Sequence, residues 1–115
     1  MKRGDIVLIR FPFTDLTSSK VRPALVVSSD GFSSRTEDAI FIFISSKTDK
    51  PQSTDFLLDQ NHSEFIETGL AKSSLIKTGK IASLSKSLAS RLLGQVNQNT
   101  MGRINKILLE ILDLN

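Results

Sequence analysis

The sequence predicts a mostly β fold with α: a small antiparallel β-barrel or curled sheet, closed off by C-terminal helices. Short apolar runs rich in β-branched residues alternate with polar loops through most of the chain. After residue 85 the hydrophobic spacing becomes that of helices. The length of 115 residues, with no internal repeat, suits a single domain over 1–115.

Four strands are expected in the first sixty residues, over 5–13, 21–28, 39–44 and 55–59. The first has apolar residues on both faces, which is typical of the middle of a sheet, and Pro12 should end its pairing. Polar loops are expected between these strands, at 14–20, 30–38 and 47–54.

The second half is expected to add two short strands and two helices. Residues 61–67 fit either one helical turn or an extended segment, and 73–78 and 80–84 fit strands around Gly79. Ser85 is a good N-cap, and apolar residues follow it at helical spacing up to Gly94, a suitable C′ residue. A last helix with one apolar stripe should begin at Asn99 or Thr100.

Composition excludes several kinds of chemistry. The chain has no cysteine and one histidine, His62, so thiolate zinc sites, disulfides and paired-histidine metal motifs are excluded. There is no run of about 18 apolar residues and no secretory cleavage pattern, so we expect a cytoplasmic protein that does not enter membranes. The net charge of +3 favours anionic partners.

Arg22 is the first candidate for chemistry. It stands between the polar loop and an apolar strand, and Pro23 fixes the backbone that follows it. A guanidinium held in this way is suited to bind a phosphate. The alternative is a strand-end arginine that pairs with Asp5 or Asp15.

Hydroxyl, basic and aromatic side chains are further candidates. Ser45 and Ser46 follow the third apolar strand, where they either donate hydrogen bonds to a phosphate or mark an ordinary transition into a loop. Phe13 and Phe32 lie in or beside loops and can stack on a base, although packing is the simpler role. A run of lysines has two interpretations: it binds along a nucleic-acid backbone, or it is a solvated surface. These lysines are Lys72, Lys77, Lys80 and Lys86.

The segments 4–9 (Gly-Asp-Ile-Val-Leu-Ile) and 22–28 (Arg-Pro-Ala-Leu-Val-Val-Ser), joined by a polar loop, resemble the opening of the MazF/PemK toxin family. These toxins are the ribonuclease halves of type II toxin–antitoxin pairs, also called mRNA interferases. The resemblance continues through the strand ending in Ser45 and through 67–70, 74–76 and 80–84 to the C-terminal helices. It therefore covers essentially the whole chain.

The resemblance implies an SH3-like barrel, a homodimer and a cognate antitoxin. It also implies growth arrest through sequence-specific cleavage of single-stranded RNA, including mRNA, without a metal or other cofactor. The products would carry a 2′,3′-cyclic phosphate and a free 5′-hydroxyl. Attack by the RNA's own 2′-hydroxyl suits a chain without cysteine or paired histidines, because it requires only charge stabilisation and proton transfer.

The resemblance also implies roles for single residues. Arg22 matches the family's catalytic arginine, and Ser45 falls where many members place a threonine that contacts the scissile phosphate. A guanidinium is a poor base, so we expect Arg22 to bind the phosphate and stabilise the transition state. The general base is not assigned, and the candidates are the substrate's surroundings, water, Asp15 and His62. The residues expected to bind substrate are Thr14, Asp15, Lys20, Ser46, Lys47, Lys77 and Lys80.

The sequence is also compatible with two other functions. One is a non-catalytic binding module on the same fold, like the related CcdB toxins that poison DNA gyrase. The other is an inactive relative, because a serine stands where a threonine is usual.

Overall fold

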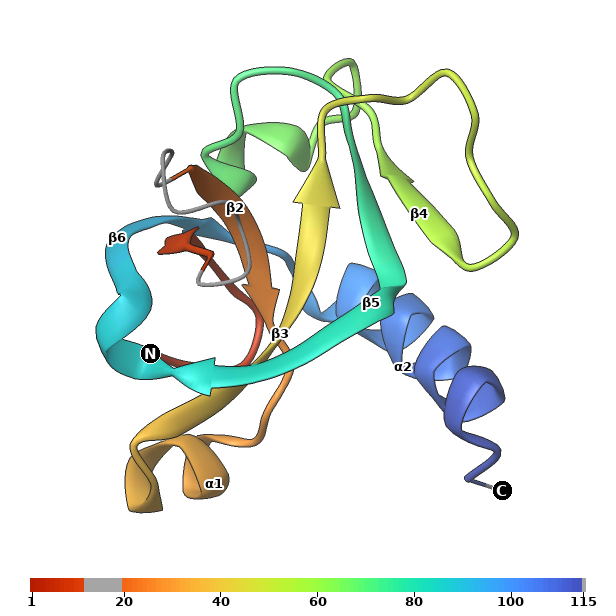
Figure 1. Cartoon of the computed structure of the whole chain (residues 1–115). Coiled ribbons are helices and arrows are strands. Elements are labelled where there is room, and N and C mark those ends of the chain that lie inside the picture. The colour runs from red at the N-terminus through yellow and green to blue at the C-terminus, as the bar shows by residue number, and fades with distance from the viewer. Residues whose placement is uncertain (12–19, 115) are drawn as a thin grey trace.

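A curled six-stranded antiparallel sheet, in the order β4-β5-β3-β2-β1-β6, forms the centre of the molecule (Figure 1). The structure is a computed structural model that describes residues 1–11 and 20–114. The strands are β1 (Asp5–Arg10), β2 (Val21–Val26), β3 (Asp38–Ser45), β4 (Asp55–Leu58), β5 (Ser74–Ser85) and β6 (Ala89–Gln95). The helices are α1 (Asp30–Arg35) and α2 (Gln98–Leu112), with two 3₁₀ turns, η1 (Phe65–Thr68) and η2 (Lys86–Leu88).

The mostly β prediction is therefore confirmed, with one difference in its closure. β4 and β6 are the edges of the sheet, and no strand pairing among the described residues joins them. One helix, α2, follows the sheet instead of the two that were expected. None of the helices in the described part of the chain has the length and apolar character needed to cross a membrane.

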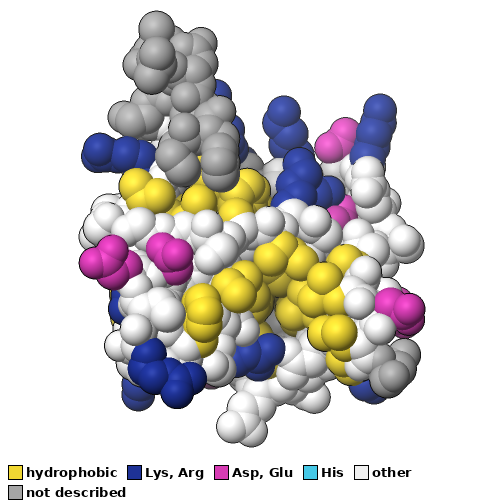
Figure 2. Space-filling model, turned by 60° about the horizontal axis from the view of Figure 1, so that its bottom comes forward, with side chains coloured by type: hydrophobic (Ala, Val, Ile, Leu, Met, Phe, Trp, Pro, Cys, Tyr) yellow, Lys and Arg dark blue, Asp and Glu magenta, His cyan; other side chains and the backbone are white. Residues whose placement is uncertain are grey.

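Some large apolar side chains remain at the surface. On the face drawn in Figure 2, hydrophobic side chains gather across the middle, and Lys and Arg side chains lie around them. The most exposed large apolar residues of the described chain are Ile66, Leu92, Leu112 and Leu114.

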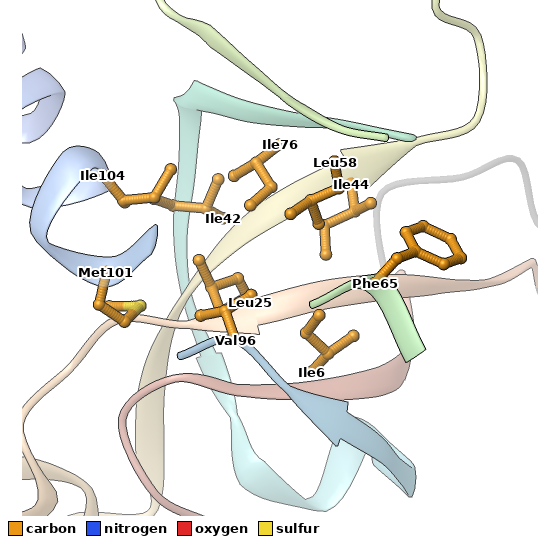
Figure 3. Close-up of a cluster of buried hydrophobic side chains, with 10 residues drawn as sticks. All are labelled: Ile6, Leu25, Ile42, Ile44, Leu58, Phe65, Ile76, Val96, Met101 and Ile104. Atoms are coloured by element: carbon orange, nitrogen blue, oxygen red, sulfur yellow. The ribbon is translucent and has the colours of Figure 1, made fainter. Parts of the chain in front are cut away.

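Two buried apolar clusters occupy opposite faces of the sheet, because successive strand residues point to opposite sides. Ile6, Leu25 and Ile42 pack with Met101 and Ile104 of α2 in the first cluster (Figure 3). The second cluster contains Val7, Ile9, Phe11, Ala24, Val26, Ala39, Phe41 and Leu84. β1 lies inside the sheet, between β2 and β6, as the apolar residues on both of its faces predicted.

β5 is one twelve-residue strand instead of the two expected around Gly79. Its register with β3 shifts abruptly, because Ile42 lies opposite Ile81 whereas the next residue, Phe43, lies opposite Lys77. Residues 78–80 are thus additional residues in β5, and such a bulge bends and twists a strand. Gly79 does mark this bend, but pairing with β3 on both sides keeps the strand continuous.

The helix predicted from Ser85 to Leu93 is wrong. Ser85 caps only the short η2, where its hydroxyl accepts a hydrogen bond from the Ser87 N–H at 3.3 Å. Residues 89–95 then pair with β1 as the edge strand β6. The helical spacing of the leucines did not determine the structure here. As a strand, this segment forms backbone hydrogen bonds with the free edge of β1, which a helix would leave unpaired.

Gly94 consequently has a different role from the predicted helix end. It lies in β6 opposite Ile6, and a Cβ atom there would be 2.2 Å from the carbonyl oxygen of Glu67. The absence of a side chain at Gly94 lets η1 pack directly against β6.

Two smaller expectations also change, and one open alternative is resolved. Residues 30–35 form α1 where a loop was expected, with Ser29 as the N-cap that accepts from the Phe32 N–H. The N-cap of α2 is Asn97 instead of Asn99 or Thr100, and its side chain accepts from the Thr100 N–H at 2.9 Å. Of the two alternatives for 61–67, a helical turn is present, at residues 65–68.

Candidate active site

A cavity of about 570 Å³ lies at the end of β2 and β3 where the second apolar cluster reaches the surface. It receives side chains from β2, β3, β5, the loop over 46–54 and Phe11, which directly follows β1. The described residues that line it are Phe11, Arg22, Phe43, Ile44, Ser45, Lys47, Asp49, Lys50, Lys77 and Lys80. We call it the Arg22 cavity.

Strand register brings Arg22 and Ser45 to this cavity together. Ala24 of β2 lies opposite Phe43 of β3 in the antiparallel ladder. Arg22 is two residues before Ala24 and Ser45 is two residues after Phe43, so the continued register places them opposite each other. Both keep the face on which Ala24 lies, because side chains two residues apart in a strand share a face.

Arg22 does not pair with Asp5, which was one of its structural alternatives. Arg22 lies opposite Ile9 on β1, four residues from Asp5, and the Asp5 carboxylate accepts from the Lys2 N–H at 2.8 Å. Asp15, the other suggested partner, lies outside the described residues. Within 1–11 and 20–114, the exposed Arg22 guanidinium has no ion pair or hydrogen bond, which leaves its donors available to an anion.

The hydroxyl of Ser45 has a defined environment. Its oxygen accepts a hydrogen bond from the Lys47 N–H at 3.2 Å, and the residue is half-buried at the end of β3. Because a hydroxyl both accepts and donates, this bond leaves the Ser45 O–H proton free to donate toward the cavity. Ser46 follows the end of β3 and does not line the cavity.

Four lysines surround the arginine and the serine. Lys47 and Lys50 come from the loop, Lys77 from β5, and Lys80 from the bulge that interrupts the pairing of β5 with β3. Asp49 is the one carboxylate among the described lining residues. The cavity therefore carries a clear excess of positive charge, which favours a polyanion.

Lys77 differs from the other lysines because it already has a partner. Its Nζ lies 2.6 Å from Oδ2 of Asp55, whose side chain is 2% exposed, against 18% for Lys77. Burial alone would raise the pKa of Asp55. The hydrogen bond from the Gln52 N–H, the hydrogen bond and charge of Lys77, and the charge of Lys80 outweigh burial and hold this pKa below its ordinary value.

The apolar wall of the cavity was not predicted from the sequence. Phe11 and Phe43 pack edge to face with ring centroids 4.3 Å apart, and both rings line the cavity. Phe11 falls within the first expected strand (5–13) and Phe43 within the third (39–44), where an apolar side chain is expected to belong to the core. Phe13 lies outside the described residues, and Phe32, the other proposed stacking residue, belongs to α1.

Several predicted residues lie elsewhere. Lys20 does not line the cavity, and Thr14 and Asp15 lie outside the described residues. His62 lines a separate cavity of about 410 Å³ with Asp59 and Arg103. Lys86 donates to the Ser33 carbonyl and so serves the fold. In the described ranges, no three His, Asp or Glu side chains gather in a way that could hold a metal ion.

A family model for the PemK-like, MazF-like toxin of type II toxin–antitoxin systems matches residues 2–112. The chain therefore belongs to this family, which confirms the resemblance seen in its first and second strands. No curated protein matches the sequence.

Solved structures show the same fold. A MazE–MazF complex from Deinococcus radiodurans aligns with a TM-score of 0.79 at 19% identity, covering 100% of this chain and 98% of the other. MazF alone from that organism gives 0.78 at 19% identity, with coverages of 99% and 97%. An endoribonuclease in complex with its cognate antitoxin, from a mycobacterial species, gives 0.75 at 22% identity, with coverages of 100% and 97%.

Proposed function

We propose that this protein is a metal-independent endoribonuclease toxin that cleaves single-stranded RNA, including mRNA, at specific sequences in the cytoplasm. The observation that carries the proposal is the meeting of Arg22 and Ser45 in one cationic cavity. Membership of the toxin family and the mycobacterial endoribonuclease among the similar structures support it.

The reaction is an internal transesterification. The 2′-oxygen of the RNA attacks the adjacent phosphorus, the bond to the 5′-oxygen breaks, and a 2′,3′-cyclic phosphate forms. The 5′-oxygen takes up a proton from water and leaves as a hydroxyl. Arg22 donates to one non-bridging phosphate oxygen and Ser45 to the other, so both stabilise the negative charge that develops on the phosphorane.

Asp49 is assigned to accept the proton of the attacking 2′-hydroxyl. Of the bases considered from the sequence, His62 lines the other cavity, and Asp15 lies outside the described residues. Asp49 is the carboxylate that lines the described part of the Arg22 cavity, and a carboxylate can act as a general base where a guanidinium cannot.

The cavity also supports the choice of a single-stranded substrate. Phe11 and Phe43 offer ring surface on which an unpaired base can lie, beside lysines that neutralise backbone phosphates. A base within a duplex is stacked on both sides and cannot reach such rings. Lys47, Lys50 and Lys80 would bind phosphates next to the scissile one.

Two protein partners belong to the proposal. The first is a cognate antitoxin, because one similar structure is an endoribonuclease in complex with its cognate antitoxin. An acidic or apolar segment of the antitoxin would cover the cationic cavity. The second is another copy of this chain, because apolar side chains such as Leu92 and Leu112 remain exposed and hydrophobic surface gathers on one face (Figure 2).

The test is incubation of the purified protein with mixed single-stranded RNA in EDTA, beside Arg22→Ala. We expect cleavage by the wild type, 2′,3′-cyclic phosphate ends by mass spectrometry, and loss of cleavage in the variant. Growth arrest on expression, without cleavage of any RNA, would contradict the proposal and favour a binding toxin. Recovery of growth on co-expression of the neighbouring gene would identify the antitoxin.

A further inference from the structure

Asp55 does not line the Arg22 cavity, yet it contacts a lysine that does. Its Oδ2 lies 2.6 Å from Nζ of Lys77, and the carboxylate is almost completely buried. Such a charge is stable in a folded chain only with close partners, so its position is fixed more tightly than that of a surface aspartate.

The same oxygen holds a second group. Oδ2 of Asp55 also accepts a hydrogen bond from the Gln52 N–H at 2.8 Å, and the Asp55 N–H donates to the Gln52 carbonyl at 3.0 Å. Gln52 belongs to the loop over 46–54, which brings Lys47, Asp49 and Lys50 to the cavity. One buried carboxylate oxygen thus joins β5 to the far end of this loop.

Strand register explains why the contact forms. Asp55 of β4 and Phe43 of β3 both lie opposite Lys77, on either side of β5. Directly opposed residues of antiparallel strands place their side chains on the same face. Lys77 therefore lies between Asp55 and Phe43, which belongs to the aromatic wall of the cavity. The ion pair with the Asp55 carboxylate sets the position of the Lys77 ammonium between them.

We propose that Asp55 is a positioning residue of the ribonuclease site, which fixes the Lys77 ammonium and anchors the 46–54 loop for binding RNA phosphate. This inference rests on the proposed function. A free lysine side chain loses about 2 kcal/mol of rotamer entropy when it is ordered. The ion pair with Asp55 orders the Lys77 side chain before RNA binds. Asp55 accepts from one of the three N–H groups of the ammonium, which leaves two for phosphate oxygens.

The test is a double-mutant cycle on RNA cleavage with Asp55→Asn, Lys77→Met and the double variant. Asp55→Asn should lower kcat/KM about tenfold, mainly through KM, in the wild-type background. In the Lys77→Met background the same change should cost less than about twofold. Equal losses in the two backgrounds would overturn the positioning of Lys77 by Asp55, because Asp55 would then act without Lys77.

A second measurement does not depend on ribonuclease activity. Labelling by an amine-reactive reagent, followed by mass spectrometry, should be several-fold faster at Lys77 in Asp55→Asn than in the wild type. The exposed Lys72 serves as the internal control and should not change. Asp55→Glu, which restores the charge, should return Lys77 labelling toward the wild-type rate.

The two measurements separate the failure of the inference from that of the proposed function. If the wild type cleaves no RNA, the proposed function fails, and labelling still tests whether Asp55 holds Lys77. If Lys77 labelling is unchanged in a folded Asp55→Asn protein, the positioning role is overturned even where cleavage is intact. Circular dichroism at the assay temperature identifies variants that remain folded.

Discussion

The register of β2 with β3, continued by two residues, places Arg22 near the start of one strand opposite Ser45 at the end of the other, although the two residues lie far apart in the sequence. The pairing of Ala24 with Phe43, two residues further into the sheet, holds both positions. A guanidinium and a hydroxyl are thereby presented to one cavity by the rigid part of the fold. Such placement keeps donors aimed at developing charge without reorganisation during the reaction.

Substitution of Arg22 should affect chemistry far more than folding. Arg22→Ala removes the main donor to the phosphorane and should lower kcat about 10²- to 10³-fold. Because the side chain is exposed and has no ion pair among the described residues, the free energy of unfolding should change by less than about 0.5 kcal/mol. Single-turnover cleavage and urea unfolding measure the two quantities.

Arg22→Lys is the matched control for this prediction. It keeps the charge but loses the planar fork that binds two phosphate oxygens, so its rate should lie between those of the wild type and Arg22→Ala. A large loss of stability in Arg22→Ala would mean that the arginine serves the fold.

The hydroxyl of Ser45 should matter more than the size of the side chain. Ser45→Ala removes the O–H donor and should lower kcat about tenfold. Ser45→Thr retains the donor and restricts χ1, so its activity should equal or exceed that of the wild type. Equal activity of all three proteins under single-turnover conditions would exclude a contact between Ser45 and the reacting phosphate.

Asp49 gives a test of the proton acceptor. Asp49→Asn keeps the shape but cannot take a proton, so kcat should fall about 10²-fold while KM stays near the wild-type value. The control is Asp59→Asn, which removes a carboxylate from the other cavity and should leave cleavage unchanged. If Asp49→Asn cleaves normally, Asp49 is not the general base, and water, the substrate's surroundings or Asp15 must accept the proton.

Local signals in the sequence made Arg22 and Ser45 candidates, and the resemblance to the toxin family gave them their expected roles. Each lies where an apolar strand meets a polar loop, and such boundaries are visible in the order of residues alone. Lys77 and Lys80 were also predicted, but only as part of a basic run. That Lys80 reaches the cavity depends on the bulge at 78–80, which only the pairing with β3 reveals.

The features that were missed depend on contacts between distant segments. Phe11 and Phe43 fall in apolar stretches of sequence that predict strands, and nothing in the local pattern shows that the core reaches the surface there. The leucines after Ser85 have helical spacing, but their segment pairs with the free edge of β1 as the strand β6. In each case tertiary pairing outweighed the local preference.

The lowered pKa of Asp55 predicts how stability depends on pH. Folding favours the charged carboxylate, so its contribution is complete above the ordinary pKa of about 3.8 and is lost as the pH falls through the lower folded-state pKa. Asp55→Asn should therefore cost about 1–3 kcal/mol at pH 7, and this difference should shrink below about pH 4. Urea unfolding of both proteins at pH 7, 5 and 3 measures it. A difference that stays constant down to pH 3 would contradict the assigned charge of Asp55.

Gly94 and Gly102 form a matched pair for the last prediction. A Cβ atom at Gly94 would meet the Glu67 carbonyl oxygen at 2.2 Å and the Thr68 backbone at 2.6 Å, so β6 and η1 must separate to admit it. Gly94→Ala should therefore destabilise the fold by more than about 2 kcal/mol. Gly102 lies within α2 with open space around its Cβ position, so Gly102→Ala should stabilise the protein by about 0.5–1 kcal/mol. Thermal unfolding of both variants measures these changes in stability. A Gly94→Ala protein as stable as the wild type would show that η1 does not pack this closely against β6.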